Sequence, residues 1–344
     1  MVYFQCDYLE GCHPKLLDRL LQTNELQAPG YGKDPFCDSA RQKIRCACGA
    51  PDADVHFLVG GTQTNLVAIS SVLRCHQGVI SADEGHIAGH EAGAIEATGH
   101  KVLTLPSEDG KITAAQIASY FEDHILSDIR EHMVQPGMVY ISFPTESGTL
   151  YSKQELEAIS QVCRRYQLPL YLDGARLGYG LTSPANDVTL EDLAALCDAF
   201  YIGGTKCGAL FGEALVITND SLKKDFRYCI KQRGAMLAKG RLLGLQFDAL
   251  FTDNLYFEIC SNALQSAFAI RKAFQDKGIS MFGTSQTNQQ FPILKNTQLP
   301  VFDGKFVYEV WAKPDSEHTI VRFCTSWATK QCDVEDLITA IQTL

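Results

Sequence analysis

The chain has 344 residues, of which 46% are hydrophobic and 20% are charged, and its formal net charge at pH 7 is −10. This composition is typical of a globular protein with a substantial core, and the length favours one large and one smaller domain. An acidic chain does not suit a protein that neutralises nucleic-acid phosphates across a broad basic face, so we expect no nucleic-acid partner. A small anionic ligand is still allowed, because it needs only a local pocket.

The cysteines and the hydropathy pattern bear on the compartment. There is no basic start followed by an apolar run and no stretch long enough to span a bilayer, so we expect a cytoplasmic protein without a membrane partner. The 13 cysteines are scattered rather than spaced as in a disulfide scaffold, which favours reduced thiols in the core. The one close pair, Cys46 and Cys48, has no second pair to complete a zinc site, so we expect no metal.

Short apolar runs alternate with helical patterns in the first part of the chain, which predicts βαβ units and a mainly parallel sheet. The predicted strands cover residues 55–59, 78–81, 101–105, 138–143, 169–172 and 199–202. Helices are predicted from Asn65 onward, over 152–166 and over 190–196. The second of these has Ser152 and Glu155 at the spacing of a capping box.

After Phe226 the pattern changes. The remaining predicted elements are helices over 237–250 and 256–274, strands over 291–294, 306–310 and 319–324, and a helix over 334–344. The expected fold is therefore α/β. It has a large domain over residues 1–230, whose N-terminal segment packs near a smaller α+β domain over residues 231–344.

Three loops follow predicted parallel strands, at the ends where ligands bind in open α/β sheets: 60–65, 173–176 and 203–206. In the first loop, Gly60, Gly61 and Thr62 lead into a helix. A glycine-rich turn of this kind offers free backbone N–H groups and a positive dipole end to a phosphate. The alternative is a turn that only starts a helix.

The second loop begins with Asp173, directly after the apolar run 170–172. A carboxylate at that position is largely desolvated and needs a cation or a strong donor. A protonated pyridine nitrogen would meet this need, as in pyridoxal 5'-phosphate (PLP), which withdraws electrons while that nitrogen is protonated. The alternative partners are Arg176 and the backbone of the following turn.

The third loop carries Lys206, with small residues on both sides. Small neighbours let a bulky ring approach the backbone, and a desolvated lysine can act as a nucleophilic amine. The alternative is a surface lysine in a turn. A phosphate loop, an acid and a lysine on successive strand ends together favour a PLP site.

Six segments of the chain resemble the threonine aldolase and β-eliminating lyase family of fold-type-I PLP-dependent enzymes. They run in order from near the N-terminus to the end of the chain: residues 31–35, residues 60–65, His86 with Glu91, residues 172–177, residues 203–206 and residues 321–323. The Asp-Gly-Ala-Arg-Leu and Gly-Gly-Thr-Lys segments are the most specific. The resemblance implies a mainly parallel large domain with a smaller α+β domain, and a homodimer or homotetramer with active sites at the subunit interface.

The resemblance also implies roles for individual residues. Lys206 would hold PLP as a Schiff base, and Asp173 would face the pyridine nitrogen. Gly61 and Thr62 would bind the phosphate. The other implied site residues are His86, which would stack on the ring near the substrate's β-hydroxyl, and Arg176 and Arg322, which would grip the substrate's carboxylate.

The chain departs from the commoner family members at two places. Residues 236–241 replace a triple-glycine run, and position 60 is glycine where serine is frequent. Both departures resemble the branch that includes phenylserine aldolases. Lys239 and Arg241 would either reach a phosphate across a subunit interface or lie on a solvated helix face.

His86 has two further interpretations. His86 and His90 stand four residues apart, which on a helix would place two imidazoles on one face, as in some zinc sites. The strand-like run before His86 favours a turn instead, and a purely structural histidine is the other alternative.

The function that we expect is PLP-dependent retro-aldol cleavage of L-threonine, L-allo-threonine or another β-hydroxy-α-amino acid to glycine and an aldehyde. Two alternatives are a PLP-dependent β-eliminating lyase of the same fold and a non-catalytic relative. The substrate is a small amino acid in the first two cases.

Overall fold

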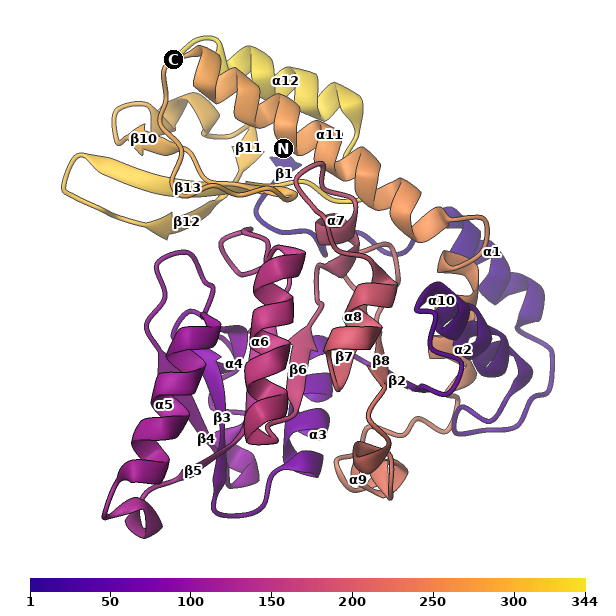
Figure 1. Cartoon of the computed structure of the whole chain (residues 1–344). Coiled ribbons are helices and arrows are strands. Elements are labelled where there is room, and N and C mark those ends of the chain that lie inside the picture. Colours follow the sequence, from indigo (N-terminus) through magenta and orange to yellow (C-terminus); the bar gives the residue numbers. More distant parts are fainter.

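A computed structural model describes all of residues 1–344, and its centre is a seven-stranded sheet (Figure 1). In spatial order the strands are β2 (Asp54–Leu58), β8 (Glu213–Ile217), β7 (Ala199–Gly203), β6 (Leu170–Asp173), β5 (Gln135–Ser142), β3 (Gln77–Ala82) and β4 (Lys101–Leu105). The five strands from β7 to β4 are parallel, and β8 runs antiparallel to both of its neighbours. The predicted α/β class with a mainly parallel sheet is confirmed.

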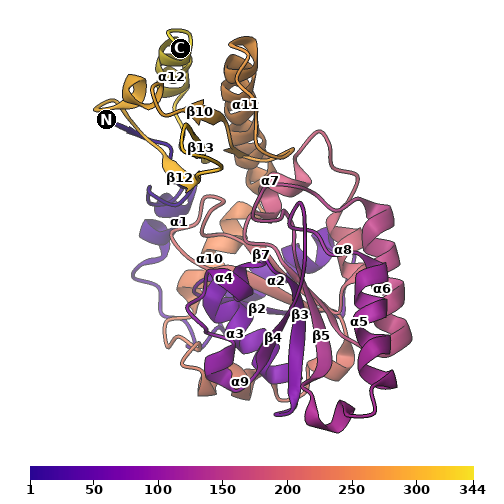
Figure 2. The same cartoon turned by 90° about the vertical axis from the view of Figure 1, so that its left-hand side faces the viewer.

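Helices cover both faces of this sheet (Figure 2). On one face lie α5 (Ala114–Leu126), α6 (Lys153–Tyr166) and α8 (Leu190–Leu196); on the other lie α3 (Gly61–Val72), α4 (His86–Gly89) and α9 (Phe226–Gln232). The predicted capping box of α6 is confirmed, since Ser152 and Glu155 exchange both of its hydrogen bonds.

Side chains alternate along the central strands between these two faces. Ile141, Leu172 and Phe200 belong to the core beneath α5, α6 and α8. Tyr140, Tyr171 and Tyr201, one residue away in each strand, belong to the core beneath α3 and α9. The α3 face therefore carries a row of three buried tyrosines on adjacent strands.

A second, smaller sheet lies above the first, at the top of Figure 1. It contains β10 (Ile293–Lys295), β13 (His318–Cys324) and β12 (Glu309–Ala312), with β9 (Gln289–Gln290) paired to β13. The long helix α11 (Leu255–Asp276) and the final helix α12 (Gln331–Ile341) pack together over it. The N-terminal strand β1 (Val2–Tyr3) pairs with β11 (Phe306–Val307) beside it.

Several predicted boundaries are wrong in detail. The strand predicted over 291–294 begins only after Pro292, as β10. The strand predicted over 306–310 is divided between β11 and β12, which pair in different sheets. The helix predicted from residue 237 begins at Arg241, as α10 (Arg241–Leu250).

The division of the chain near residue 230 stays a prediction. The first half of α11, including Tyr256 and Cys260, packs in the core of the large sheet, whereas Phe274 packs in the core of the small sheet. The same helix therefore contributes to both hydrophobic cores.

The other helices are the α-helices α1 (Pro14–Thr23), α2 (Pro35–Ala47) and α7 (Leu177–Leu181), and the short 3-10 helices Glu96–Thr98, Arg130–His132, Asp220–Leu222 and Leu299–Phe302. None of the helices combines the length and the apolar character needed to cross a membrane.

Candidate active site

The loops after β6 and β7 touch each other at the carboxyl edge of the large sheet. The backbone N–H of Gly203 donates to the carbonyl of Gly174 over 2.9 Å. A β-carbon at Gly174 would collide with the carbonyl oxygen of Tyr201, and one at Gly203 would collide with that of Ala175. Only glycine allows this approach. It brings the loop of Asp173 beside the loop that carries Lys206.

Asp173 is 3% exposed and accepts four hydrogen bonds. Its Oδ2 accepts from the Tyr140 hydroxyl at 2.7 Å and from the Asn65 amide at 3.0 Å. Its Oδ1 accepts from the Tyr201 hydroxyl at 2.5 Å and from the backbone N–H of Ala175 at 3.0 Å. Four donors stabilise the ionised carboxylate, so this site can hold a buried negative charge opposite a cation.

The start of α3 provides an uncapped helix terminus. Gly60 is its N-cap, and no side chain caps the free N–H groups. A β-carbon at Gly61 would lie 3.0 Å from the Tyr201 hydroxyl, whereas one at Gly60 would meet nothing within 4 Å. Thr62 is exposed at the same turn. Close packing thus favours glycine at position 61, while position 60 has room for a side chain.

Lys206 is held by its backbone, and its amine is left available. The Tyr179 hydroxyl donates to the Lys206 carbonyl over 2.7 Å. The Lys206 Nζ lies 5.9 Å from the centroid of the Tyr8 ring, and it forms no ion pair. Asp7, Glu213 and His86 all lie close enough for the lysine charge to affect their pKa values. The interpretation of Lys206 as a surface turn residue therefore loses support.

Glu213 holds the turn that precedes Lys206 through two hydrogen bonds. The Thr205 hydroxyl donates to Oε1 over 2.8 Å, and the backbone N–H of Gly204 donates to Oε2 over 3.0 Å. Burial raises the pKa of Glu213 to about 8, although these hydrogen bonds and the charge of Lys206 act to lower it. Nothing in the sequence pattern had singled out this glutamate.

The raised pKa of Glu213 predicts a pH dependence of stability. Between its ordinary pKa and about 8, the unfolded chain releases this proton and the folded protein keeps it, so stability falls as pH rises. Glu213→Gln should remove this loss. We expect its free energy of unfolding, relative to the parent, to rise by at most roughly 1.4 kcal/mol per pH unit between about pH 5 and 8. Urea unfolding at several pH values would measure it, and a constant difference would contradict the prediction.

His86 is the first residue of the short helix α4, so it lies at a helix start and not in the predicted turn, and its ring lies beside that of His90 with centroids 5.7 Å apart. Its Nδ1 is 2.8 Å from Oε1 of Glu91. Burial alone would lower the pKa of His86, but the hydrogen bond to Glu91 and the charges of Glu146 and Asp173 raise it overall. No group of three His, Cys, Asp or Glu side chains is arranged to hold a metal.

The two arginines come from different sheets. Arg176 follows β6, and its Nε and NH2 donate to the two carboxylate oxygens of Asp7 at 2.7 and 3.0 Å. Arg322 in β13 donates to Oε1 of Gln289 over 2.8 Å and pairs with Glu309, and its Nε is buried without a partner. Burial raises the pKa of the Cys324 thiol, and the charges of both guanidinium groups act to lower it.

Asp7 is a functional candidate that sequence reasoning missed. It is fully buried, and it also accepts from the Asn288 amide over 2.9 Å. Burial alone would raise the pKa of Asp7, but the charges of Arg176 and Lys206 lower it to about 2. No local motif surrounds it, and its partners lie far away in the sequence.

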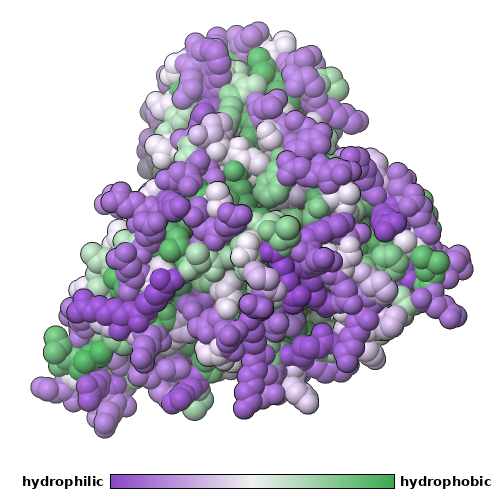
Figure 3. Space-filling model, turned by 45° about the vertical axis from the view of Figure 1, so that its right-hand side comes forward, coloured by the Kyte–Doolittle hydropathy of each residue, from purple (hydrophilic) through white to green (hydrophobic).

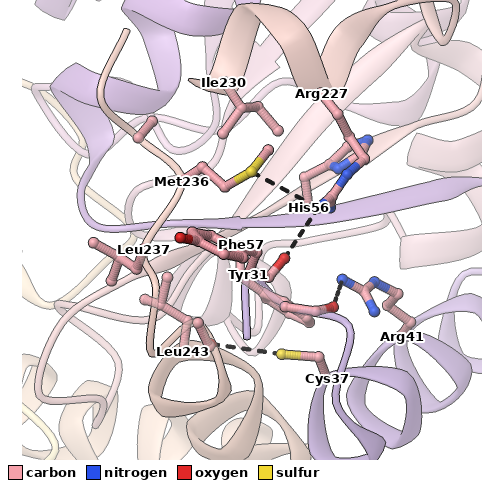
Figure 4. Close-up of a pocket in the computed structure, with 13 residues that line it drawn as sticks. Tyr31, Cys37, Arg41, His56, Phe57, Arg227, Ile230, Met236, Leu237 and Leu243 are labelled. Carbon is pink, nitrogen blue, oxygen red and sulfur yellow. Dashed lines mark hydrogen bonds between the residues drawn. The ribbon is translucent and has the colours of Figure 1, made fainter. Parts of the chain in front are cut away.

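A separate cavity of about 30 Å³ lies between α2, β2 and the segment before α10 (Figure 4). Tyr31, Arg41, His56 and Arg227 line it together with Met236. Neither Asp173 nor Lys206 lines this cavity, so it lies outside the candidate active site. The segment 31–35 thus contributes a wall of this cavity.

Lys239 and Arg241 lie near the same segment, at the start of α10. Lys239 is exposed. Arg241 donates to the backbone carbonyls of Thr23 and Leu26, and its guanidinium lies over the ring of Phe36. Its side chain therefore ties the loop after α1 to α10.

Comparison with known proteins bears on this arrangement. Residues 14–290 match the family model described as beta-eliminating lyase. The chain is 29% identical to a low specificity L-threonine aldolase of a Pseudomonas strain, over 98% of this chain and 96% of the relative. It is 30% identical to a low specificity L-threonine aldolase of Pseudomonas aeruginosa, over 84% and 83%. A solved structure described as a threonine aldolase of Leishmania major superposes with a TM-score of 0.97 at 47% identity, covering 100% and 99%.

Proposed function

The chain belongs to the beta-eliminating lyase family, and from this membership we propose that it cleaves L-threonine, L-allo-threonine or a related β-hydroxy-α-amino acid to glycine and an aldehyde. It is a PLP-dependent lyase with the fold of the fold-type-I enzymes. The observation that carries the proposal is a buried carboxylate with four donors, Asp173, next to the loop of a lysine without an ion pair.

The site residues fit the functional groups of PLP. The uncapped first turn of α3, with Gly61 and Thr62, would hold the phosphate. Asp173 would hold the protonated pyridine nitrogen, because its environment keeps a negative charge. The amine of Lys206 would hold the cofactor covalently, and His86 would stack on the ring. When bound, PLP withdraws electrons from the substrate's Cα, which makes the Cα–Cβ bond cleavable.

Arg176 and Arg322 are the candidates to bind the substrate's carboxylate. Asp7 fixes the orientation of Arg176, and Gln289 and Glu309 fix that of Arg322. A carboxylate held by a fixed guanidinium can turn very little, so the Cα–Cβ bond keeps one direction relative to the site. This orientation selects which bond breaks.

His86 is the candidate to take the proton of the β-hydroxyl. Its side chain is 31% exposed, while Glu91 behind it is fully buried. The ring can therefore face a substrate on one side and a carboxylate on the other. As the Cα–Cβ bond breaks, the hydroxyl oxygen becomes the carbonyl of the aldehyde and its proton passes to the base.

The products distinguish this reaction from β-elimination. Purified enzyme supplied with PLP should release equal amounts of glycine and acetaldehyde from L-threonine or L-allo-threonine. A β-eliminating lyase would instead release ammonia and a keto acid from a substrate with a leaving group on Cβ. Formation of the keto acid without glycine would overturn the proposed function.

We further propose that the chain assembles into a homodimer or homotetramer with active sites at the interface. The face drawn in Figure 3 is mainly hydrophilic, with small and separate hydrophobic areas. Tyr31, Tyr228 and Met236 line one surface depression together with Arg227 and Lys231, and Tyr228 is 77% exposed. A grouped set of exposed aromatic side chains is typical of protein–protein contacts.

Tyr228→Glu should weaken this assembly. A charge in the centre of an interface costs about 2 kcal/mol or more, so the dissociation constant should rise roughly 30-fold. Light scattering after size-exclusion chromatography would show a smaller particle at micromolar concentration. Leu126→Glu is the matched control, since Leu126 is 79% exposed elsewhere. An unchanged mass for Tyr228→Glu would contradict the assignment of this surface.

A cytoplasmic location is also our proposal. Burial raises the pKa of the Cys48 and Cys163 thiols to about 12, so both stay protonated and unreactive. Thiols of this kind serve as small core side chains in a reducing compartment.

A further inference from the structure

Asn65 lies between two buried carboxylates. Its Nδ2 is 2.8 Å from Oε1 of Glu91 and 3.0 Å from Oδ2 of Asp173, and its Oδ1 accepts from the Tyr171 hydroxyl over 2.9 Å. All four side chains are buried. The opposite amide orientation would point the carbonyl oxygen of Asn65 at both carboxylates. The two N–H bonds of Asn65 therefore donate one to Glu91 and one to Asp173.

Glu91 extends this row of hydrogen bonds from Asn65 to His86. Its Oε1 is also 2.8 Å from Nδ1 of His86, and its Oε2 is buried without a partner. An ionised carboxylate only accepts, so the proton of a neutral His86 must sit on Nδ1. The lone pair is then on Nε2, the other ring nitrogen.

We propose that Glu91 is a positioning residue that holds His86 in its Nδ1–H form and so leaves Nε2 as the proton acceptor for the substrate's β-hydroxyl. Asn65 connects this pair to Asp173 and separates the two acids. The inference rests on the proposed function, because the proton transferred is that of the β-hydroxyl.

The proton and electrons balance within this scheme. The O–H bond of the β-hydroxyl breaks and its proton binds Nε2, while the oxygen forms the second bond of the aldehyde carbonyl. The electron pair of the Cα–Cβ bond stays with Cα. The resulting imidazolium is stabilised by Glu91, which keeps its hydrogen bond from Nδ1. That proton later leaves Nε2 for Cα, directly or through a solvent molecule that protonates Cα, and this completes glycine.

Glu91→Gln keeps the size of the side chain and removes its charge. Other groups also act on His86. The charges of Glu146 and Asp173 raise its pKa, the charge of Lys206 lowers it, and the ring of His90 lies beside it. Without the charge of Glu91, the acid limb of the kcat/KM profile should move down by about half a pH unit or more. The value of kcat should fall roughly ten- to a hundredfold with KM little changed. Glu96→Gln, an exposed neighbour, is the control and should match the parent.

Glu91→Leu tests the tautomer directly in the holoenzyme. Histidine side-chain ¹⁵N spectra, assigned with His86→Asn, should show the Nδ1–H form in the parent and its loss in Glu91→Leu. An unchanged tautomer, or an unchanged kcat and acid limb in Glu91→Gln, would overturn the role of Glu91. If the parent enzyme releases no glycine, the proposed function is wrong. The spectra need no turnover, so they would still determine the tautomer of His86.

Discussion

Asp173→Asn is expected to lower kcat for threonine cleavage by roughly 100- to 5000-fold. Removing one partner of a buried ion pair costs about 3 to 5 kcal/mol, and each 1.36 kcal/mol of barrier is tenfold in rate. The asparagine would also turn an N–H group toward donors such as Tyr140 or Tyr201, which now donate to the carboxylate. Cofactor content should persist, because Lys206 is intact. Steady-state kinetics and the absorbance of the bound cofactor measure both effects.

Asp198→Asn is the matched control for this variant. Asp198 lies just before β7, at the opposite edge of the sheet, and accepts from the backbone N–H of Leu170 over 2.7 Å. Its replacement should lower stability and leave kcat unchanged. Near-parental kcat in Asp173→Asn would show that no cation depends on that carboxylate.

Asp7→Asn is expected to have the largest effect on stability. It leaves the buried guanidinium of Arg176 without a charged partner, which costs about 3 to 5 kcal/mol. The pKa of Asp7 is lowered to about 2, so its contribution is complete above the ordinary pKa and is lost as pH falls from about 4 to 2. Chemical unfolding should therefore show a difference in free energy of unfolding between the parent and Asp7→Asn at neutral pH, and this difference should become smaller in acid.

Asp38→Asn controls for the loss of any aspartate–arginine pair. Asp38 pairs with Arg41 at 2.7 Å, but its side chain is 69% exposed. Exposed pairs contribute at most about 1 kcal/mol. Equal losses in the two variants would mean that burial of the Asp7 pair is not the source of its strength.

Six strands of the large sheet could be predicted because buried strands are continuous apolar runs, whereas the helices α1, α2, α5 and α9 were not predicted. Residues 101–105 and 190–196 were placed at the bounds that the structure gives to β4 and α8. β8 was missed, since it begins with Glu213, a charged residue that pattern reading assigns to a loop. Its carboxylate is buried by tertiary contacts with Thr205 and Gly204, which no local pattern reveals.

The sequence pattern places the candidate residues at strand ends, but it does not reveal the partners that neighbouring strands supply. Asp173 lies two residues after Tyr171, so alternation alone could have placed it on the α3 face, above Asn65. Tyr140 and Tyr201 come from the adjacent strands, and their register with β6 is not encoded locally. The same holds for Asp7, which lies 169 residues before Arg176 in the chain.

The central claim is that Lys206 holds the cofactor opposite Asp173. Borohydride reduction of the PLP-loaded enzyme, followed by proteolysis and mass spectrometry, would locate the covalently fixed cofactor. We expect its mass on the peptide that contains Lys206, and no such label in Lys206→Ala. Cofactor mass on another lysine would contradict the account. A Lys206 peptide without cofactor mass, from an enzyme that is active, would contradict it as well.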